Sequence, residues 1–345
     1  MINDPTLPPL PAQPEGTPWP TDEWPTGELP ESIRDPVERL FEKASSDPDA
    51  YGRTDAFLVV QSGKIVFERY GAECGPQKTY PSWSKAKSIT HALAGIAIYK
   101  GALQLHSPAA VPEWRDAGDP RSGITLEQLL RMVSGLEFNE DYENSGVSHT
   151  IEMLWGEGKP DVAHYAASRP AEHKPGSFWS YSSGTTNIVC RLIASALNLD
   201  RSRFEQFMRA RLFDPIGMRS ALPKFDHAGT FVGSSFCFCT ARDFARFGLL
   251  YLRNGIWNGT RILPEGWVDH ARTPTPTVPQ EEPMGYGAHW WLGLAGPGSF
   301  SANGYDGQYT VLVPEKDLIF VRHGASEAQK ETVRDWLAEV AASFN

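Results

Sequence analysis

The sequence lacks a basic surface, a long apolar run and a leader-like start. Its 345 residues carry 42 acidic side chains against 32 Lys and Arg, for a net charge of −10. An acidic chain offers no electrostatic footprint for nucleic acid or for an anionic membrane surface. No stretch approaches the roughly 20 apolar residues of a membrane span, and residues 1–5 lack the basic start of a secretory signal. We therefore expect a cytoplasmic protein with neither nucleic-acid nor membrane partners.

Cysteines and closely spaced metal ligands are also scarce. The nine histidines form neither H-x-H nor H-E-x-x-H, so the spacing that presents two imidazoles to one zinc ion is missing. The cysteines include no C-x-x-C pair, and we interpret all four as reduced structural thiols. We expect no metal and no cofactor. The four cysteines are Cys74, Cys190, Cys237 and Cys239.

Proline is abundant in the first 30 residues. It recurs every few positions through residues 1–30, which excludes helix and sheet interiors and predicts an extended arm that wraps the body. After this arm, residues 36–41 are interpreted as the start of a helix, because Pro36 suits an early helical position and apolar residues follow at helical spacing.

The expected strands lie near both ends of the chain. Residues 56–70 and 309–321 each contain two β-rich runs around a turn, the pattern of a hairpin, while residues 88–253 show mostly helical apolar spacing. This order predicts an α/β (α+β) fold with one antiparallel sheet flanked by helices, an all-helical subdomain, and a cleft at their junction. The predicted parts are an arm at 1–30 and one domain at 31–345, with an α/β part at about 31–83 and 285–345 and a helical part at about 84–284.

The main chemical motif is S-x-x-K, which occurs twice in overlapping registers before an apolar helical run. A serine in the first turn of a helix and a lysine three residues later share one face, so the amine can take the hydroxyl proton. Burial at the helix start lowers the lysine pKa and keeps the amine neutral. We prefer the register that contains the small Ala86, and the other register stays open. The two registers are Ser84 with Lys87 and Ser82 with Lys85.

The segment W-S-K-A-K-S at residues 83–88 resembles the serine β-lactamase and penicillin-binding superfamily, and within it the class C-like esterases and 6-aminohexanoate-dimer hydrolases. The similarity continues through I-T-L-E-Q-L-L-R-M-V-S-G-L at residues 124–136 and covers roughly residues 55–325. The resemblance implies a β-lactamase/transpeptidase-like fold. By contrast, residues 230–236 do not match G-x-S-x-G, so the sequence does not support an α/β-hydrolase nucleophile turn.

A second segment of the resemblance is P-G-S-F-W-S-Y-S-S-G at residues 175–184. The resemblance implies that Tyr181 shares protons with Lys87 and protonates the leaving group, and that Ser183 stands where many relatives have Asn and contacts the substrate. A phenol beside a lysine suits this role, since each lowers the cost of the other's charge.

A third segment, A-N-G-Y-D-G-Q, begins at Ala302, which takes the place of a cation in many relatives. The missing cation disfavours substrates that are recognised by a carboxylate. The resemblance also implies that the backbone N–H groups of Ser84 and Tyr305 form the oxyanion hole and that Asn303 and Gly304 bind the substrate.

Tyr142 lies where some oligoamide hydrolases of the family place a tyrosine against the substrate, so we include it among the expected substrate-binding residues. The two acidic residues just before it, Glu140 and Asp141, are interpreted as solvated loop residues.

These motifs together predict a serine hydrolase. Ser84 attacks an ester or amide carbonyl, Lys87 and Tyr181 relay the proton to the leaving group, and water releases the acyl-enzyme. We favour a carboxylesterase or small linear-amide hydrolase, with β-lactamase or D-Ala-D-Ala peptidase as the alternative. A non-catalytic ligand-binding relative, and a scaffold that recruits partners through its arm, are alternatives of other classes. The expected partner is a small ester or amide substrate, and the sequence leaves a homodimer open.

Overall fold

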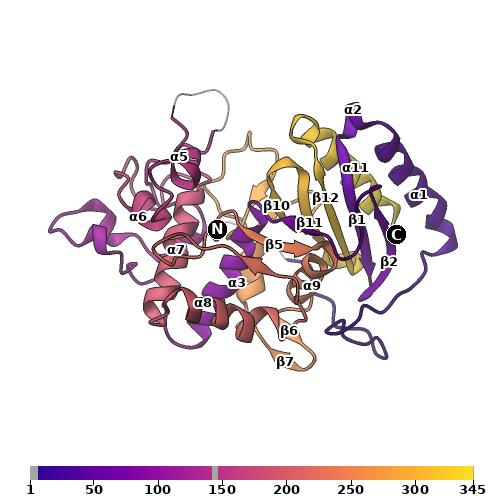
Figure 1. Ribbon diagram of the computed structural model, residues 1–345, viewed down its shortest axis with the longest axis horizontal. Coiled ribbons are helices and arrows are strands. Elements are labelled where there is room, and N and C mark those ends of the chain that lie inside the picture. Colours follow the sequence, from indigo (N-terminus) through magenta and orange to yellow (C-terminus); the bar gives the residue numbers. More distant parts are fainter. Residues whose placement is uncertain (1–6, 142–146, 345) are drawn as a thin grey trace.

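A seven-stranded antiparallel sheet joins the two ends of the chain in the computed structural model, which describes residues 7–141 and 147–344 (Figure 1). Its strand order is β2-β1-β12-β11-β10-β9-β8, so the first strand pairs with the last. The predicted hairpins are β1–β2 and β11–β12, and the antiparallel sheet expected from the sequence is confirmed. The strands are β1 (Arg53–Gln61), β2 (Lys64–Tyr70), β8 (Gly285–Tyr286), β9 (Trp291–Leu292), β10 (Phe300–Gly304), β11 (Gln308–Val313) and β12 (Leu318–Ala325).

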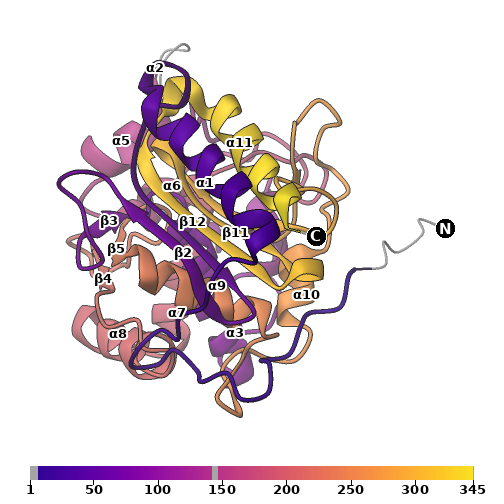
Figure 2. The same cartoon turned by 90° about the vertical axis from the view of Figure 1, so that its right-hand side faces the viewer.

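Helices cover both faces of this sheet. Figure 2 shows α1 and α11 in front of the strands, and α3 and α9 pack against the opposite face. Because β1 is covered on both sides, residues 56–60 are all buried and form a continuous apolar run rather than an alternating one. Phe57 packs on Trp336 of α11 with ring centroids 4.8 Å apart, whereas Leu58 joins the core on the other face. The helices are α1 (Glu31–Ser46), α3 (Lys85–Tyr99), α9 (Ala241–Leu252) and α11 (Lys330–Ser343).

The first helix starts earlier than the sequence pattern indicated. We expected the start at residues 36–41, but α1 begins at Glu31 and Pro36 lies inside it. The carbonyl of Pro30 accepts the first helical hydrogen bonds, and Ile33 extends the buried face of the helix by one turn before Val37. Pro36 has no backbone N–H and makes no hydrogen bond to the preceding helical turn. It is half-exposed, so this missing bond lies on the solvent side of the helix.

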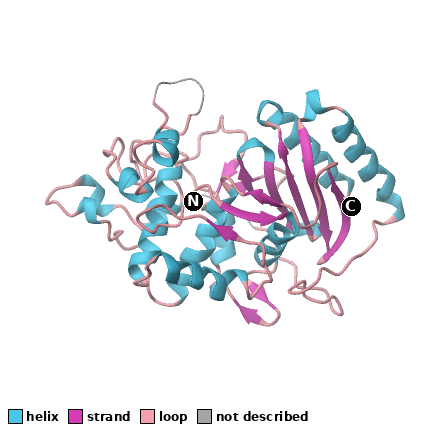
Figure 3. Cartoon of the chain, viewed as in Figure 1, coloured by secondary structure: helices cyan, strands magenta, loops and turns pink. Residues whose placement is uncertain are grey.

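A helix-rich part lies beside the sheet, on the left of Figures 1 and 3. It surrounds α7, which packs against α3, α4 and α6. Short strands also occur here, in a three-stranded sheet β3-β5-β4 and a small β6–β7 hairpin. The remaining elements are β3 (Thr79–Pro81), β4 (Leu222–Pro223), β5 (Cys237–Thr240), β6 (Ile256–Trp257), β7 (Thr260–Arg261), α2 (Pro48–Tyr51), α4 (Leu126–Leu130), α5 (His149–Trp155), α6 (Val162–Ala167), α7 (Ser183–Ala196), α8 (Arg201–Met208) and α10 (Trp267–Arg272).

Buried arginines hold the proline-rich arm against the body. Arg246 donates to the carbonyl of Pro20 at 2.6 Å, and Arg272 donates to the carbonyl of Pro8 at 2.6 Å. An extended segment without a strand partner leaves its carbonyls unpaired, and these guanidinium groups satisfy them. No described helix is both long enough and apolar enough to cross a lipid bilayer.

Candidate active site

The site begins at the turn that leads into α3. Ser84 is the N-cap residue of α3, and Trp83 before it has a φ of 42°. A bulky side chain in the left-handed region is strained, and such residues cluster at functional sites. The turn leaves Ser84 half-buried at the start of α3, which contacts both β10 of the sheet and α7 of the helix-rich part. The Oγ atom of Ser84 accepts a hydrogen bond from Nζ of Lys87 at 3.0 Å.

Lys87 is 1% exposed, and its Nζ atom donates hydrogen bonds to oxygen acceptors. Besides Ser84, its Nζ atom donates to Oγ of Ser183 and to the carbonyl of Ser234, each at 3.0 Å. Burial lowers the pKa of Lys87 to about 8, although the negative charge of Glu140 raises it in part. Lowering the pKa from 10.5 toward neutral pH increases the fraction of neutral amine, which is the form that a general base requires.

Tyr181 also contacts Lys87, through its aromatic ring. Nζ of Lys87 lies 4.7 Å from the centroid of the Tyr181 ring, which packs against Trp291 at 5.2 Å and Tyr286 at 5.9 Å. Burial raises the pKa of Tyr181, and the charge of Glu140 raises it further, while hydrogen bonds with Ser84 and Trp291 act in the opposite direction. The phenol therefore carries its proton at neutral pH and is available as a proton donor.

Glu140 connects to this group through Ser183. The hydroxyl of Ser183 donates to Oε1 of Glu140 at 2.6 Å, and its backbone N–H donates to Oε2 at 2.8 Å. Thr150 of α5 donates to Oε2 as well, at 2.7 Å. The interpretation of Glu140 as a solvated loop residue is therefore wrong. The sequence pattern alone could not identify it, because its partners lie 10 and 43 residues further along the chain.

The two S-x-x-K registers have different environments. Ser82 is buried and its hydroxyl donates to the carbonyl of Ser235 at 3.0 Å. Lys85 faces β12, where its Nζ atom lies 3.4 Å from Nε2 of His323 and 3.4 Å from the centroid of the Phe244 ring. The structure therefore brings together a serine and a lysine in the preferred register, while the side chains of Ser82 and Lys85 contact separate groups.

The third segment of the resemblance lies at the end of β10. A Cβ at Gly304 would lie 2.4 Å from the carbonyl of Ser82, so only glycine allows this approach to the turn before α3. Tyr305 follows, and its ring meets the Trp83 ring edge-on at 5.9 Å. Asn303 is buried, with Nδ2 3.8 Å from the sulfur of Met284. The substrate-binding roles of Ser183, Asn303 and Gly304 and the oxyanion-hole roles of Ser84 and Tyr305 stay predictions, and Tyr142 lies outside the described residues.

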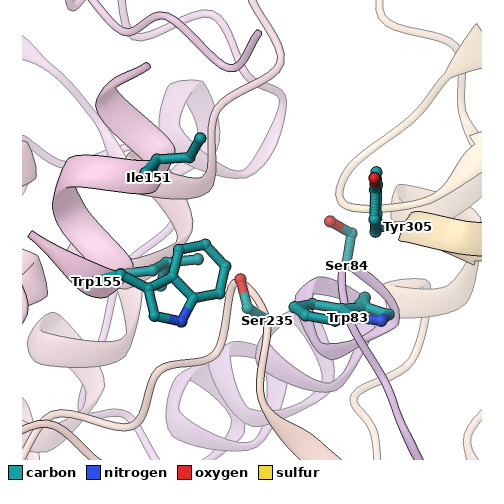
Figure 4. A pocket seen from close by; sticks show the side chains of 7 residues that line it. Trp83, Ser84, Ile151, Trp155, Ser235 and Tyr305 are labelled. Carbon is teal, nitrogen blue, oxygen red and sulfur yellow. The ribbon is translucent and has the colours of Figure 1, made fainter. Parts of the chain in front are cut away.

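A cavity of about 320 Å³ opens beside Ser84, between α5 and the end of β10. Figure 4 shows the Ser84 hydroxyl directed into the space between the α5 side chains and Tyr305. The α5 side chains and Ser235 were not predicted to be part of the site, because a helical sequence pattern does not show which elements pack beside the exposed face of the helix. The lining residues are Trp83, Ser84, Ile151, Leu154, Trp155, Ser235 and Tyr305.

Metal ligation finds no support in the described part of the chain. Within residues 7–141 and 147–344, no group of three or more His, Cys, Asp or Glu side chains is arranged to hold an ion. The site therefore consists of hydroxyl, amine, carboxylate and backbone groups, which suit acyl transfer by a serine nucleophile.

Comparison with solved structures supports the fold. A candidate 6-aminohexanoate-dimer hydrolase from Bacillus anthracis superimposes with a TM-score of 0.74 at 22% identity, covering 92% of this chain and 87% of that one. A penicillin-binding protein homologue from Caulobacter crescentus gives a TM-score of 0.69 at 16% identity, over 92% and 99% of the two chains. The expected β-lactamase/transpeptidase-like fold is confirmed.

Sequence comparison identifies the family. The 6-aminohexanoate-dimer hydrolase of Paenarthrobacter ureafaciens is 27% identical over 316 residues, which span 85% of this chain and 79% of the relative. The family model described as Beta-lactamase matches residues 40–342. The chain therefore belongs to the Beta-lactamase family and is a hydrolase of the serine β-lactamase-like type.

Proposed function

We propose that this hydrolase cleaves an ester or a small linear amide through an acyl-enzyme on Ser84. The observation that carries the proposal is the set of contacts around Lys87. The carbonyl of Ser234 can only accept, and the hydroxyl of Ser183 directs its own proton to Glu140, so both take an N–H from Nζ. The protonated amine has a third N–H, which it donates to Oγ of Ser84. When the amine loses this proton, a lone pair takes its place and can accept the Ser84 hydroxyl proton.

The reaction follows from these contacts. Oγ of Ser84 attacks the carbonyl carbon while Lys87 takes the hydroxyl proton. The backbone N–H groups of Ser84 and Tyr305 stabilise the oxyanion. Tyr181 then donates its proton to the departing alkoxide or amine and recovers one from Lys87. Water attacks the acyl-enzyme with the same groups as base, which returns the proton to Ser84 and releases the acid.

Two observations favour esters and linear amides over β-lactams. Ala302 lies buried in β10, at the position where the resemblance places a cation for the substrate carboxylate. The relative from Paenarthrobacter ureafaciens, which aligns over 85% of the chain, is named for a linear amide substrate. β-Lactam and D-Ala-D-Ala hydrolysis are therefore tested as alternatives.

The deciding experiment measures hydrolysis of p-nitrophenyl esters, a linear aminoacyl amide, nitrocefin and a D-Ala-D-Ala peptide by the native enzyme, Ser84→Ala, Lys87→Ala and Tyr181→Phe. We expect ester or amide turnover that falls by about 10²- to 10⁴-fold in the lysine and tyrosine variants and further in Ser84→Ala. Turnover confined to nitrocefin or the peptide would favour the alternatives.

Covalent labelling separates a catalyst from a ligand-binding relative. A fluorophosphonate probe is expected to add one label to the native enzyme, and fragmentation of the labelled peptide is expected to place it on Ser84. Label on Ser82 instead would mean that Ser82 and Lys85 form the catalytic pair. A folded, unlabelled protein without turnover would indicate a non-catalytic relative.

A further inference from the structure

We infer that the cavity beside Ser84 selects an uncharged, apolar acyl group. The inference rests on the proposed function and narrows it: among esters and linear amides, those whose acyl group carries a charge, as an aminoacyl amide does, are expected to react more slowly than those with an apolar acyl group. Apart from the hydroxyls of Ser84 and Ser235, every side chain that lines the cavity is aromatic or aliphatic, and no charged side chain of the described residues is among them.

Helix α5 presents apolar side chains to the mouth of this cavity. Ile151 and Trp155 are four residues apart and therefore lie on one face of the helix. Their exposed fractions are 37% and 50%, and Tyr305 across the cavity is 38% exposed. When an apolar ligand covers large exposed apolar side chains, the free energy of the system falls, because apolar surface is removed from water. An acyl chain seated here would remove this surface from water.

The arrangement around Ser84 separates the acyl side from the leaving-group side. Tyr181 donates a proton to the leaving group in the proposed reaction, and its ring packs with Trp291 and Tyr286, none of which lines the cavity. The leaving group therefore lies on the Tyr181 side of the nucleophile. The cavity on the α5 side is left for the acyl chain.

The lining also disfavours a charged acyl chain. A carboxylate or ammonium placed between Trp83, Leu154 and Trp155 would lose its hydration and meet no side chain of opposite charge among the residues that line the cavity. Burying an unpaired charge is strongly unfavourable. A volume of about 320 Å³ lies near the lower end of the range for small-molecule sites, so the cavity limits chain length as well.

The test uses p-nitrophenyl esters with one leaving group and varied acyl groups. Along the straight-chain series from acetate to laurate, kcat/KM is expected to rise about three- to fourfold per added methylene, pass through a maximum and then fall. Hexanoate is compared with its charged counterparts, the adipate monoester and 6-aminohexanoate. Each charged ester is expected to be at least tenfold slower than hexanoate.

Two variants on one segment sharpen the test. Ile151→Lys places a cation at the mouth of the cavity and is expected to raise the adipate-to-hexanoate ratio of kcat/KM at least tenfold. Val147→Lys adds the same charge at an exposed residue that does not line the cavity, and is expected to leave the ratio within twofold. Trp155→Ala removes an apolar lining side chain and is expected to flatten the chain-length series.

The outcomes separate the two proposals. If Ser84 is labelled and esters are hydrolysed, but chain length has no effect or the charged esters react as fast as hexanoate, the inferred selectivity is wrong and the proposed function stands. If Ser84 is not labelled and no ester is hydrolysed by the folded protein, the proposed function fails and this inference fails with it.

Discussion

Two lysines of α3 lie two residues apart, equally buried, in different surroundings. Lys85 and Lys87 are each 1% exposed. Because successive residues turn by about 100°, positions two apart point about 200° from each other around the helix axis. Lys87 therefore faces Ser84 and the helix-rich part, while Lys85 faces the sheet.

Burial has different effects on the two lysines because different groups lie near their Nζ atoms. Burial lowers the pKa of both amines, but Lys87 has the charge of Glu140 nearby to hold its pKa at about 8, whereas the pKa of Lys85 falls well below its usual value. Burial lowers the pKa of His323, and its Nδ1 lies 2.9 Å from Oε1 of Gln308. Gln308 uses its amide N–H groups on two backbone carbonyls, so Oε1 accepts from Nδ1 and Nε2 is left to accept from Lys85. Lys87 is a base near its nucleophile, whereas Lys85 is a buried amine that contacts His323 on the side of the sheet.

Replacing each lysine in turn gives the largest expected difference. Lys87→Ala removes the general base and is expected to lower kcat/KM for ester hydrolysis by about 10²- to 10⁴-fold. Lys85→Met keeps a long side chain in this position and removes the contacts of the amine with His323 and with the Phe244 ring. It is expected to retain kcat/KM within a few-fold. Circular dichroism checks that both variants fold. Equal losses in the two variants would mean that the catalytic register has been misassigned.

The stability of the Lys85→Met variant should respond differently to pH. Lys85 has a depressed pKa in the folded state, so between that lowered pKa and its unfolded value of 10.5 the unfolded chain binds a proton that the folded chain does not. Its contribution to stability is therefore lost as pH falls below 10.5. In the native protein this group adds up to about 1.4 kcal/mol of unfolding free energy per pH unit.

Urea unfolding at several pH values from 7 to 10 measures this slope. Lys85→Met is expected to be more stable than the native protein at pH 7 and to show a smaller rise in unfolding free energy toward pH 10. Lys100→Met, at the C-cap of the same helix, removes an exposed ammonium and serves as the matched control. An unchanged slope in Lys85→Met would mean that this lysine is protonated in the folded protein.

The sheet could be predicted from the sequence because its pattern is local. The run at 56–60 and its turn define a hairpin within 15 residues, and the same holds for β11 and β12. The start of α1 was misplaced because Pro36 suits an early helical position, and only tertiary packing shows that Ile33 before it is buried in the same helix.

The catalytic pair could be predicted for a similar reason, since Ser84 and Lys87 are one helical turn apart. The sequence gives no comparable indication for Glu140, Ser234 or Trp155, because their contacts with the pair depend on how distant segments pack. A solvated acid and a buried one look alike in a loop sequence. The acyl cavity is likewise a property of packing, since α5 and β10 are separated by more than a hundred residues.

The smallest expected effect concerns how Glu140 sets the pKa of Lys87. Lys87 acts as a base when neutral, so kcat/KM for ester hydrolysis is expected to rise with pH through a limb near pH 8 and level off above it. The charge of Glu140 stabilises the protonated amine, so Glu140→Gln lowers the lysine pKa and moves the limb to lower pH. Glu137→Gln removes a carboxylate three residues earlier and is expected to leave the limb in place. A limb that moves to higher pH in Glu140→Gln, or equally in both variants, would show that the carboxylate acts on Lys87 through structure rather than charge.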